Sequence, residues 1–292
     1  MTPVHAIGEA RSFAGGVSVR VIRAGWFRPD AGGFFGVVPK PLWSRFVETD
    51  DRGRVLCRLN LLLIEAGGKR ILVETGTGVR INDKDRDIKG VEGGDPTEAL
   101  RAVGEDPASI DFVVLTHLHY DNAGGMVDTD GRPLFPHARY VVQRDDAEAA
   151  HGDELRLQGI MEVEQLDAVR DAGQLAEVNG EVELVSGVRV LRTGGHTRGS
   201  QAVLLGVERP GGRAGDPTDR GIFWGDLIPT RWQVPVRWTS AYDDYPIEAI
   251  EVRNELVARA AAEGWWCYFT HDPGEMPIRI EATDRGGFRA AE

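Results

Sequence analysis

Short apolar runs, several of them alternating with polar residues, recur along the chain and predict β-strands. Residues 17–24 alternate apolar and polar positions, which is typical of a strand with one buried face. The run IDFVVL at residues 110–115 is apolar enough for a strand buried on both faces. The same reasoning predicts strands at residues 58–65, 70–74, 139–142, 181–185, 188–192, 202–207, 221–224 and 265–269.

Helical periodicity interrupts these strands at residues 96–103, 145–150, 161–172 and 246–263. Asp95 is placed to cap the first of these helices, and Pro246 suits the first turn of the last. Gly264 supplies the stop after it. Its predicted apolar stripe consists of Ile247, Ile250, Leu256 and Val257. Strands and helices interleave without a repeat or linker, so we expect one α/β domain over residues 1–292 with mixed sheets.

Composition narrows the class of partner. The 292 residues carry 34 Lys plus Arg against 46 Asp plus Glu, a net charge of −12. This balance disfavours nucleic acid and anionic membranes, and residues 208–220 form a polar connection without ligand chemistry. There is no signal-peptide pattern and no apolar stretch near the ~20 residues that span a bilayer. The expectation is a cytoplasmic protein that acts on a small molecule.

The two cysteines are predicted to be packing residues. Cys57 and Cys267 lie far apart, each inside an apolar stretch. Small buried hydrophobes are therefore favoured over a disulfide or a thiolate ligand.

Candidate chemistry gathers where predicted strands end. Four histidines follow strands directly, in the segments THLHYDN, GGHT and FTHD, and one more strand leads into Gly225-Asp226. His117 and His119 share a side if the backbone there is extended, so both imidazoles can reach one ion. Asp121 follows two positions later, close enough for a neighbouring ion or its bound water. Imidazole and carboxylate together suit zinc, iron or manganese.

Any one of these histidines, taken alone, is better explained as an ordinary surface or core residue. The combination of four strand-terminal histidines and two strand-terminal acids favours a metal site. Gly194 and Gly195 before His196 permit the close backbone approach that such a site needs.

In the order and spacing of these elements the chain resembles the metallo-β-lactamase superfamily. The family pattern is H-x-H-x-D-H after a strand, then G-H-T or G-H-S, then an Asp after a strand, then a final His. This sequence presents THLHYDNAGG, GGHTRGS, WGDLIP and FTHDP in that order, within residues 17–275. The resemblance implies a four-layer αββα sandwich with two mixed β-sheets and the metals at one edge between them. GGFFGVVPKPLW and HDP are similar to a lactonase-like bacterial subgroup.

The resemblance also implies a ligand set for one or two ions, Zn²⁺ first, with Fe²⁺ or Mn²⁺ as alternatives. The first ion would be held by His117, His119 and His196, the second by Asp121 and His271, and both by Asp226. Asn122 stands where the family has its last motif histidine. An amide oxygen is a weaker, harder ligand than imidazole, so a second site with Asn122 could be weak, empty or selective for Mn²⁺ or Fe²⁺.

A second departure is Glu74, where the family has Asp. In the family that carboxylate orients the metal loop, and the extra methylene of Glu74 would alter the geometry. The alternative is that Glu74 ends its strand in solvent.

The mechanism implied is metal-assisted hydrolysis. A metal-bound water loses a proton and attacks the carbonyl of a lactone, ester or thioester. Asp121 would be the catalytic residue that orients this nucleophile or passes its proton on. The apolar residues 34–43 would form a pocket wall or lid, or instead a core or homodimer contact.

Three other functions remain open at this point. A mononuclear iron oxygenase of the persulfide dioxygenase kind is the main alternative, since Asn122 favours a single metal. A non-catalytic binding protein is disfavoured by the intact first ligand set, and a nuclease by the acidic charge.

The remaining candidates have ordinary explanations. His5, His137 and His151 lack strand-end partners and are not expected to bind metal. Tyr120 would point away from the metals, and Asp243 or Asp244 would cap the long helix.

Overall fold

A computed structural model describes residues 6–207 and 220–291, and it contains a large mixed sheet in the first half of the chain. His5 and most of the 208–220 connection lie outside these residues. The strands of this sheet are β1 (Ala6–Ile7), β2 (Arg11–Phe13), β3 (Val17–Phe27), β4 (Cys57–Ala66), β5 (Lys69–Val73), β6 (Glu92–Gly93), β7 (Phe112–Val114), β8 (Arg139–Gln143) and β9 (Leu175–Val178). The order is β1-β3-β4-β5-β7-β8-β9, with β2 and β6 paired to β3. Strands β3, β4 and β5 run antiparallel, whereas β5, β7, β8 and β9 run parallel.

The second half of the chain builds another mixed sheet. Its strands are β10 (Glu181–Val185), β11 (Gly187–Arg192), β12 (Gln201–Val207), β13 (Gly221–Phe223) and β14 (Trp266–Tyr268) in that order. Only β13 and β14 are parallel among these pairs of the described strands. A separate hairpin follows, formed by β15 (Ile280–Ala282) and β16 (Phe288–Ala290).

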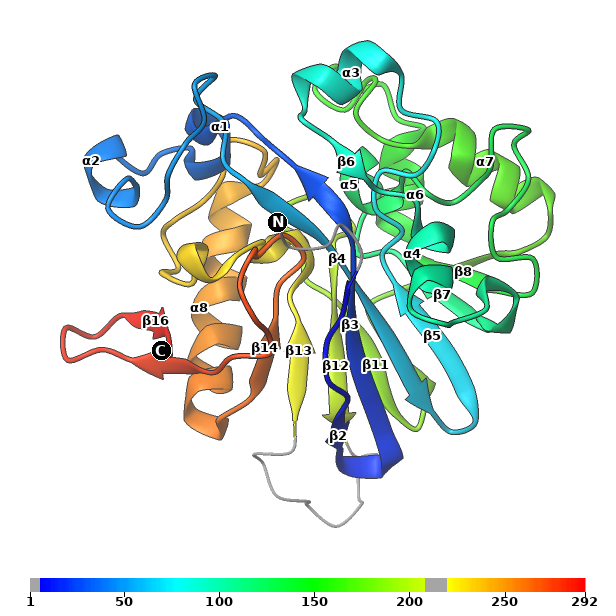
Figure 1. Ribbon diagram of the computed structural model, residues 1–292. Helices are drawn as coiled ribbons and strands as arrows, with labels where there is room; N and C mark the ends of the chain where they lie inside the picture. Colours follow the sequence, from blue (N-terminus) through cyan, green and yellow to red (C-terminus); the bar gives the residue numbers. More distant parts are fainter. Residues whose placement is uncertain (1–5, 208–219, 292) are drawn as a thin grey trace.

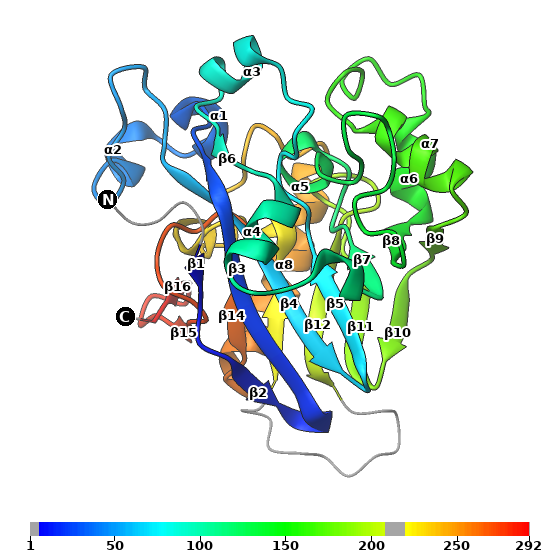
Figure 2. The same cartoon turned by 45° about the vertical axis from the view of Figure 1, so that its right-hand side comes forward.

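Eight helices are present in the described part of the chain, and four of them cover the outer faces of the two sheets (Figures 1 and 2). They are α1 (Ala31–Phe35), α2 (Lys40–Trp43), α3 (Asp83–Ile88), α4 (Pro96–Ala102), α5 (Tyr120–Ala123), α6 (Arg144–Ala150), α7 (Val163–Asp171) and α8 (Pro246–Glu263). Helices α4, α6 and α7 contribute to the core on the outer face of the first sheet. Helix α8 covers the outer face of the second sheet. The result is the expected αββα sandwich.

Strand β4 shows why its sequence is apolar at almost every position. Leu61 and Leu63 face the helices of the first sheet, while Leu62 and Ile64 face the second sheet. Leu62 pairs with Val21 of β3, which shares the inter-sheet core with Val203 and Leu205 of β12. Successive side chains of β4 point to opposite faces of the sheet, so the strand contributes to two hydrophobic cores.

The predicted elements are present, with shifted ends. Asp95 accepts hydrogen bonds from the backbone of Thr97 and Glu98 and so caps α4, and Gly264 ends α8 in the left-handed conformation with φ of 65°. The predicted stripe of α8 was wrong at Ile247, which is exposed, because Ala249 and Ala260 lie on the buried face with Leu256 and Val257. The cysteines are free and buried in β4 and β14, as expected.

The parallel strands bring the candidate residues to one edge. Strands β7 and β13 each run parallel to a neighbour and end just before His117 and Asp226. Strand β14, parallel to β13, ends just before His271. Carboxyl ends of parallel strands lie at the same edge of a sheet, so the loops after β13 and β14 leave the second sheet together, and the stacked sheets bring them to the loop after β7.

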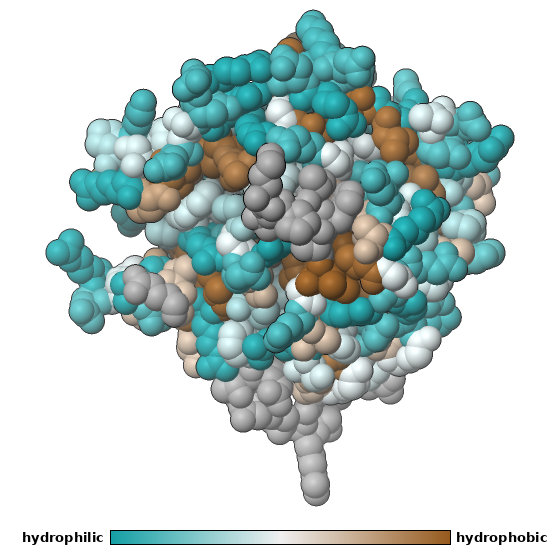
Figure 3. Space-filling view, viewed as in Figure 1, coloured by the Kyte–Doolittle hydropathy of each residue, from teal (hydrophilic) through white to brown (hydrophobic). Residues whose placement is uncertain are grey.

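The outer surface is largely hydrophilic on the face shown in Figure 3, with hydrophobic side chains gathered in small patches. None of the helices in the described ranges is long and apolar enough to cross a bilayer.

Replacing Leu256 by Ala should lower the free energy of unfolding by about 2–5 kcal/mol, because the side chain is buried between α8 and the second sheet. Urea denaturation followed by circular dichroism measures this. Ile247→Ala on the same helix is the matched control and should change stability by no more than about 0.5 kcal/mol. Equal losses in both variants would contradict the packing described for α8.

Candidate metal centre

Three histidines form a compact, buried cluster. His117 and His119 follow β7, and His196 lies in the loop between β11 and β12. One ring nitrogen from each lies within 4.8 Å of the other two, and the rings are nearly perpendicular. The Nε2 atom of His196 lies 3.0 Å from Nδ1 of His119. Three imidazole nitrogens thus point at one centre.

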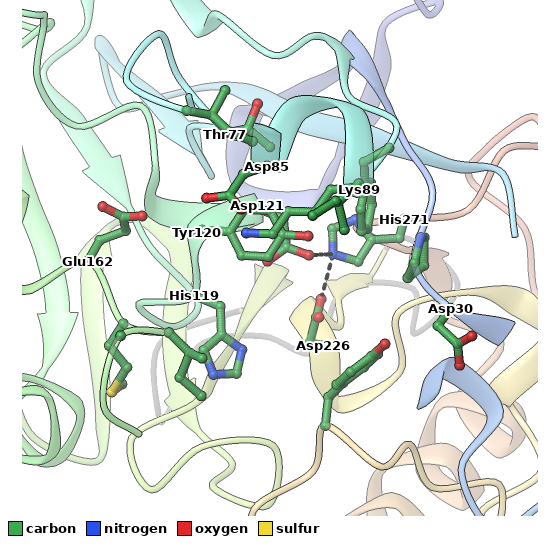
Figure 4. A pocket seen from close by; sticks show the side chains of 18 of the residues that line it. Asp30, Thr77, Asp85, Lys89, His119, Tyr120, Asp121, Glu162, Asp226 and His271 are labelled. Atoms are coloured by element: carbon green, nitrogen blue, oxygen red, sulfur yellow. Dashed lines mark ion pairs between the residues drawn. The ribbon is translucent and has the colours of Figure 1, made fainter. Parts of the chain in front are cut away.

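Asp121, Asp226 and His271 form a second cluster beside the first (Figure 4). The Nε2 atom of His271 lies 3.2 Å from Asp226 and 3.5 Å from Asp121. The other carboxylate oxygen of Asp226 lies 3.7 Å from Nε2 of His196. Asp226 therefore sits between the two clusters.

The Nδ1 atoms of three of these histidines are held by neighbouring oxygen atoms. That of His117 contacts the Thr116 hydroxyl at 3.0 Å, and that of His271 contacts the Arg58 carbonyl at 3.0 Å. That of His196 contacts the Asp243 carboxylate at 2.9 Å. A proton held on each Nδ1 leaves Nε2 as the ring atom that faces the site and that would bind an ion.

Glu74 is buried under this loop, so the solvent alternative was wrong. Its carboxylate accepts hydrogen bonds from the hydroxyl of Thr116 and, at 3.2 Å, from the side-chain amide of Asn122. Its φ of +66° is the only positive value among non-glycine residues in the described ranges. Such a backbone costs on the order of 1–3 kcal/mol and turns the carboxylate under the motif.

Asn122 is fully buried in α5 but uses only half of its amide. The Nδ2 group donates to Glu74, while Oδ1 has no hydrogen-bond partner among the described residues. The hydrogen bond to Glu74 therefore fixes the Asn122 amide and leaves its Oδ1 atom available to a ligand.

Asp243 or Asp244 was expected from the sequence to cap α8, and this was wrong for both residues. The residue before α8 is Tyr245, which makes no side-chain cap. Asp243 is fully buried, holds His196, accepts from the Ser240 backbone at 2.9 Å and lies 3.7 Å from the buried Arg253. Sequence spacing gave no signal for this contact, because 47 residues separate Asp243 from His196.

Asp146 is a second residue that sequence reasoning missed. It is buried on α6 and accepts hydrogen bonds from the Leu118 backbone, the Thr197 hydroxyl and the Gly199 backbone. One carboxylate therefore ties the loop of His117 and His119 to the loop of His196.

Burial and charge act differently on the two clusters. Burial lowers the pKa of His119 to about 3 and that of His117 well below its usual value, with the nearby histidines adding to the effect. Burial also disfavours the charged form of His271, but the nearby Asp226 outweighs it and raises the pKa to about 9. Burial raises the pKa of Glu74 to about 8, against the hydrogen bonds from Thr116 and Asn122.

Both clusters open into one pocket of about 1060 Å³. Tyr120 lines this pocket, contrary to the expectation that it packs away from the site. Phe34 from α1 also lines it, whereas Phe35 and Trp43 are buried in the core. The segment 34–43 thus serves both as pocket wall and as core. Further apolar lining comes from Ile81, Ile88, Ile160, Met161 and Val163.

The other histidines of the described ranges lie outside both clusters. His137 is exposed, and His151 contacts Asp167 through Nε2 at 2.9 Å. Neither belongs to a group of candidate metal ligands among the described residues.

Known proteins with this architecture include hydrolases. A probable metal-dependent hydrolase from Staphylococcus aureus is 26% identical, covers 92% of this chain and 94% of its own, and superposes with a TM-score of 0.82. AidC, a dizinc quorum-quenching lactonase, is 18% identical with a TM-score of 0.78 over 99% of this chain and 97% of its own. The second likeness concerns the fold alone.

Sequence comparison finds lactonases. An N-acyl homoserine lactonase from a Bacillus species is 31% identical over 175 residues, which is 59% of this chain and 60% of that protein. The lactonase AttM of Agrobacterium fabrum is 42% identical over 53 residues, 18% of each chain. The matched region thus spans about 60% of the length of the Bacillus relative. The metallo-beta-lactamase superfamily model matches residues 55–271, and the chain belongs to that superfamily.

Proposed function

We propose that this protein is a metal-dependent hydrolase that cleaves an ester-type bond in a small molecule, and that its substrates are lactones. The observation that carries this proposal is the pair of clusters that share Asp226 at the floor of one pocket. Buried imidazoles and carboxylates that converge in this way are typical of hydrolytic metal centres.

The residues present fit divalent ions. Nε2 of His117 and of His271 and Oδ1 of Asn122 are buried without a hydrogen-bond partner among the described residues. Unpaired buried polar atoms are costly, and two metal ions, one at each cluster, would satisfy them. His117, His119 and His196 would hold one ion, and Asp121, His271 and the oxygen of Asn122 a second, with Asp226 between them. Nitrogen ligands favour zinc at the first position.

An ion bound there would supply Lewis acidity and acidify a water molecule. Asp121 lies at the pocket floor and would orient that water and accept its proton. The nearby Asp226 raises the pKa of His271, so binding of an ion at that imidazole would displace a proton. Thr116, Arg58 and Asp243 would keep the three imidazoles aimed at the site.

Lactones are favoured over other esters by the relatives named N-acyl homoserine lactonases. The pocket has room for an acyl group, and its apolar wall from Phe34 to Val163 would contact such a chain. A mononuclear iron oxygenase is the weaker candidate, because the second cluster retains two carboxylates and a histidine in contact.

The freshly purified protein should hydrolyse N-hexanoyl homoserine lactone, and pH-stat titration of the released acid measures the rate. Treatment with a chelator should abolish the activity, because hydrolysis would require the bound ion. Added zinc should restore it, because the ligand clusters remain in the folded chain. Circular dichroism before and after chelation controls for unfolding. Activity that survives complete metal removal, or oxygen uptake with a thiol substrate in place of hydrolysis, would refute the proposal.

Elemental analysis should find two metal ions per chain in the wild type, because Asp121, Asp226 and His271 form a second ligand cluster to which the unpaired oxygen of Asn122 would add. Asn122→His should keep two ions and hold the weaker one more tightly, since imidazole is the stronger ligand. Asn179→His, the same exchange at an exposed position, should leave metal content and affinity unchanged. One ion in the wild type that becomes two in Asn122→His would show that Asn122 does not support the second site.

Asp243→Asn should weaken binding of the first ion by roughly tenfold, the lower end of the usual effect of removing a charge that orients a ligand. Competition with a chromophoric chelator measures the affinity. Asp244→Asn is the matched control, since its side chain accepts from Arg156 and not from a histidine. Equal affinity in wild type and Asp243→Asn would mean that the contact with His196 is only structural.

A further inference from the structure

The pocket wall carries charges of both signs, with seven carboxylates among its described lining residues. Six basic side chains line it, five of them arginines, within the part of the chain that the structure describes. Each arginine has a carboxylate partner, in the pairs Arg28–Glu92, Arg52–Asp87, Arg54–Asp50, Arg80–Glu164 and Arg156–Asp244. The sixth cation, Lys89, forms no ion pair with any described residue.

Lys89 is held firmly in this wall. It caps the C-terminus of α3, where its backbone N–H donates to the Asp85 carbonyl and its own carbonyl accepts from Arg28 at 2.7 Å. Its ammonium nitrogen lies 3.5 Å from the centre of the Tyr120 ring. Figure 4 shows the side chain extended across Tyr120 beside Asp121. The backbone and the aromatic ring together place the charge above the second cluster.

The ring face of Tyr120 does not provide an acceptor for every N–H donor of the Lys89 ammonium group. The group has three N–H donors, and water can serve the others while the pocket is empty. A substrate that fills the pocket displaces this water, and a charged donor left without an acceptor is costly. A substrate with an oxygen acceptor near the Lys89 ammonium group should therefore bind more tightly than a substrate without one.

We propose that Lys89 binds an acceptor oxygen that the substrate carries next to its lactone ring. Either an amide carbonyl or a carboxylate has the chemistry required. This inference rests on the proposed lactone hydrolysis and adds a residue that selects among lactones.

The test compares Lys89→Met with the wild type on three lactones. These are γ-butyrolactone, N-hexanoyl homoserine lactone, and a γ-butyrolactone that carries a carboxylate. Lys89→Arg keeps the charge, and Lys84→Met removes an exposed lysine on the same helix, outside the pocket lining. Metal content is measured for every variant.

Lys89→Met should lower kcat/KM by roughly tenfold for the lactone that carries the right acceptor, the size expected for a hydrogen bond to a charged group. The rate for γ-butyrolactone should stay within about twofold, a difference well below 1 kcal/mol. A loss confined to the amide substrate identifies the carbonyl as the ligand, and one confined to the carboxylated substrate identifies the anion. Lys89→Arg should retain most of the selectivity, and Lys84→Met all of it.

A binding measurement separates this inference from the proposed activity. The γ-lactam analogue of N-hexanoyl homoserine lactone resists hydrolysis, and its Kd is measured by calorimetry for the zinc-loaded wild type and Lys89→Met. The Kd should rise by roughly tenfold if the amide is the acceptor. Equal losses for all three lactones, or no loss for any, would overturn the inference while hydrolysis itself stands. Absence of hydrolysis in the wild type would refute the proposed function alone.

Discussion

The site depends on the fixed orientation of its imidazole rings. Hydrogen bonds at Nδ1 of His117, His196 and His271 leave Nε2 of each facing the pocket. The three acceptors differ in kind, a hydroxyl, a carboxylate and a backbone carbonyl, and they come from different parts of the chain. Each is buried, so water does not compete for the ring nitrogen. Rings held in this way need little reorganisation when an ion is bound, which favours tight and specific coordination.

The sandwich makes these contacts possible. Strand β7 of the first sheet and strands β13 and β14 of the second each run parallel to a neighbour, and the loops that follow them meet at the two clusters. Asp146 then ties two of these loops together, and Arg253 lies close to the carboxylate that holds His196. The strained backbone at Glu74 is stable because the surrounding sheet and loop determine it from several sides. The core thus supports the site, and the site retains buried polar groups that a purely apolar core would exclude.

The two departures from the superfamily motif belong to one contact. Glu74 is longer than the usual aspartate and Asn122 is shorter than the usual histidine, and the two side chains are joined by a hydrogen bond of 3.2 Å. The longer side chain of Glu74 reaches the shorter side chain of Asn122, so the hydrogen bond that supports the loop of His117 and His119 is kept. The same contact fixes the orientation of the Asn122 amide and leaves its oxygen free. The presence of Asn122 in place of a histidine ligand is therefore accompanied by the presence of Glu74 in place of aspartate, and the two side chains are in contact.

The sequence by itself determined the strands, the long helix and the residues of both clusters, because strand periodicity and strand-end histidines are local features. It could not place Asp243, Asp146 or Lys89, whose partners lie 47, 28 and 31 positions away along the chain. It also did not predict that Tyr120 lines the pocket, where Lys89 from a distant part of the chain lies against its ring. Only the tertiary structure decided which charges are paired, because pairing depends on distance in space and on burial, and neither is encoded in local spacing.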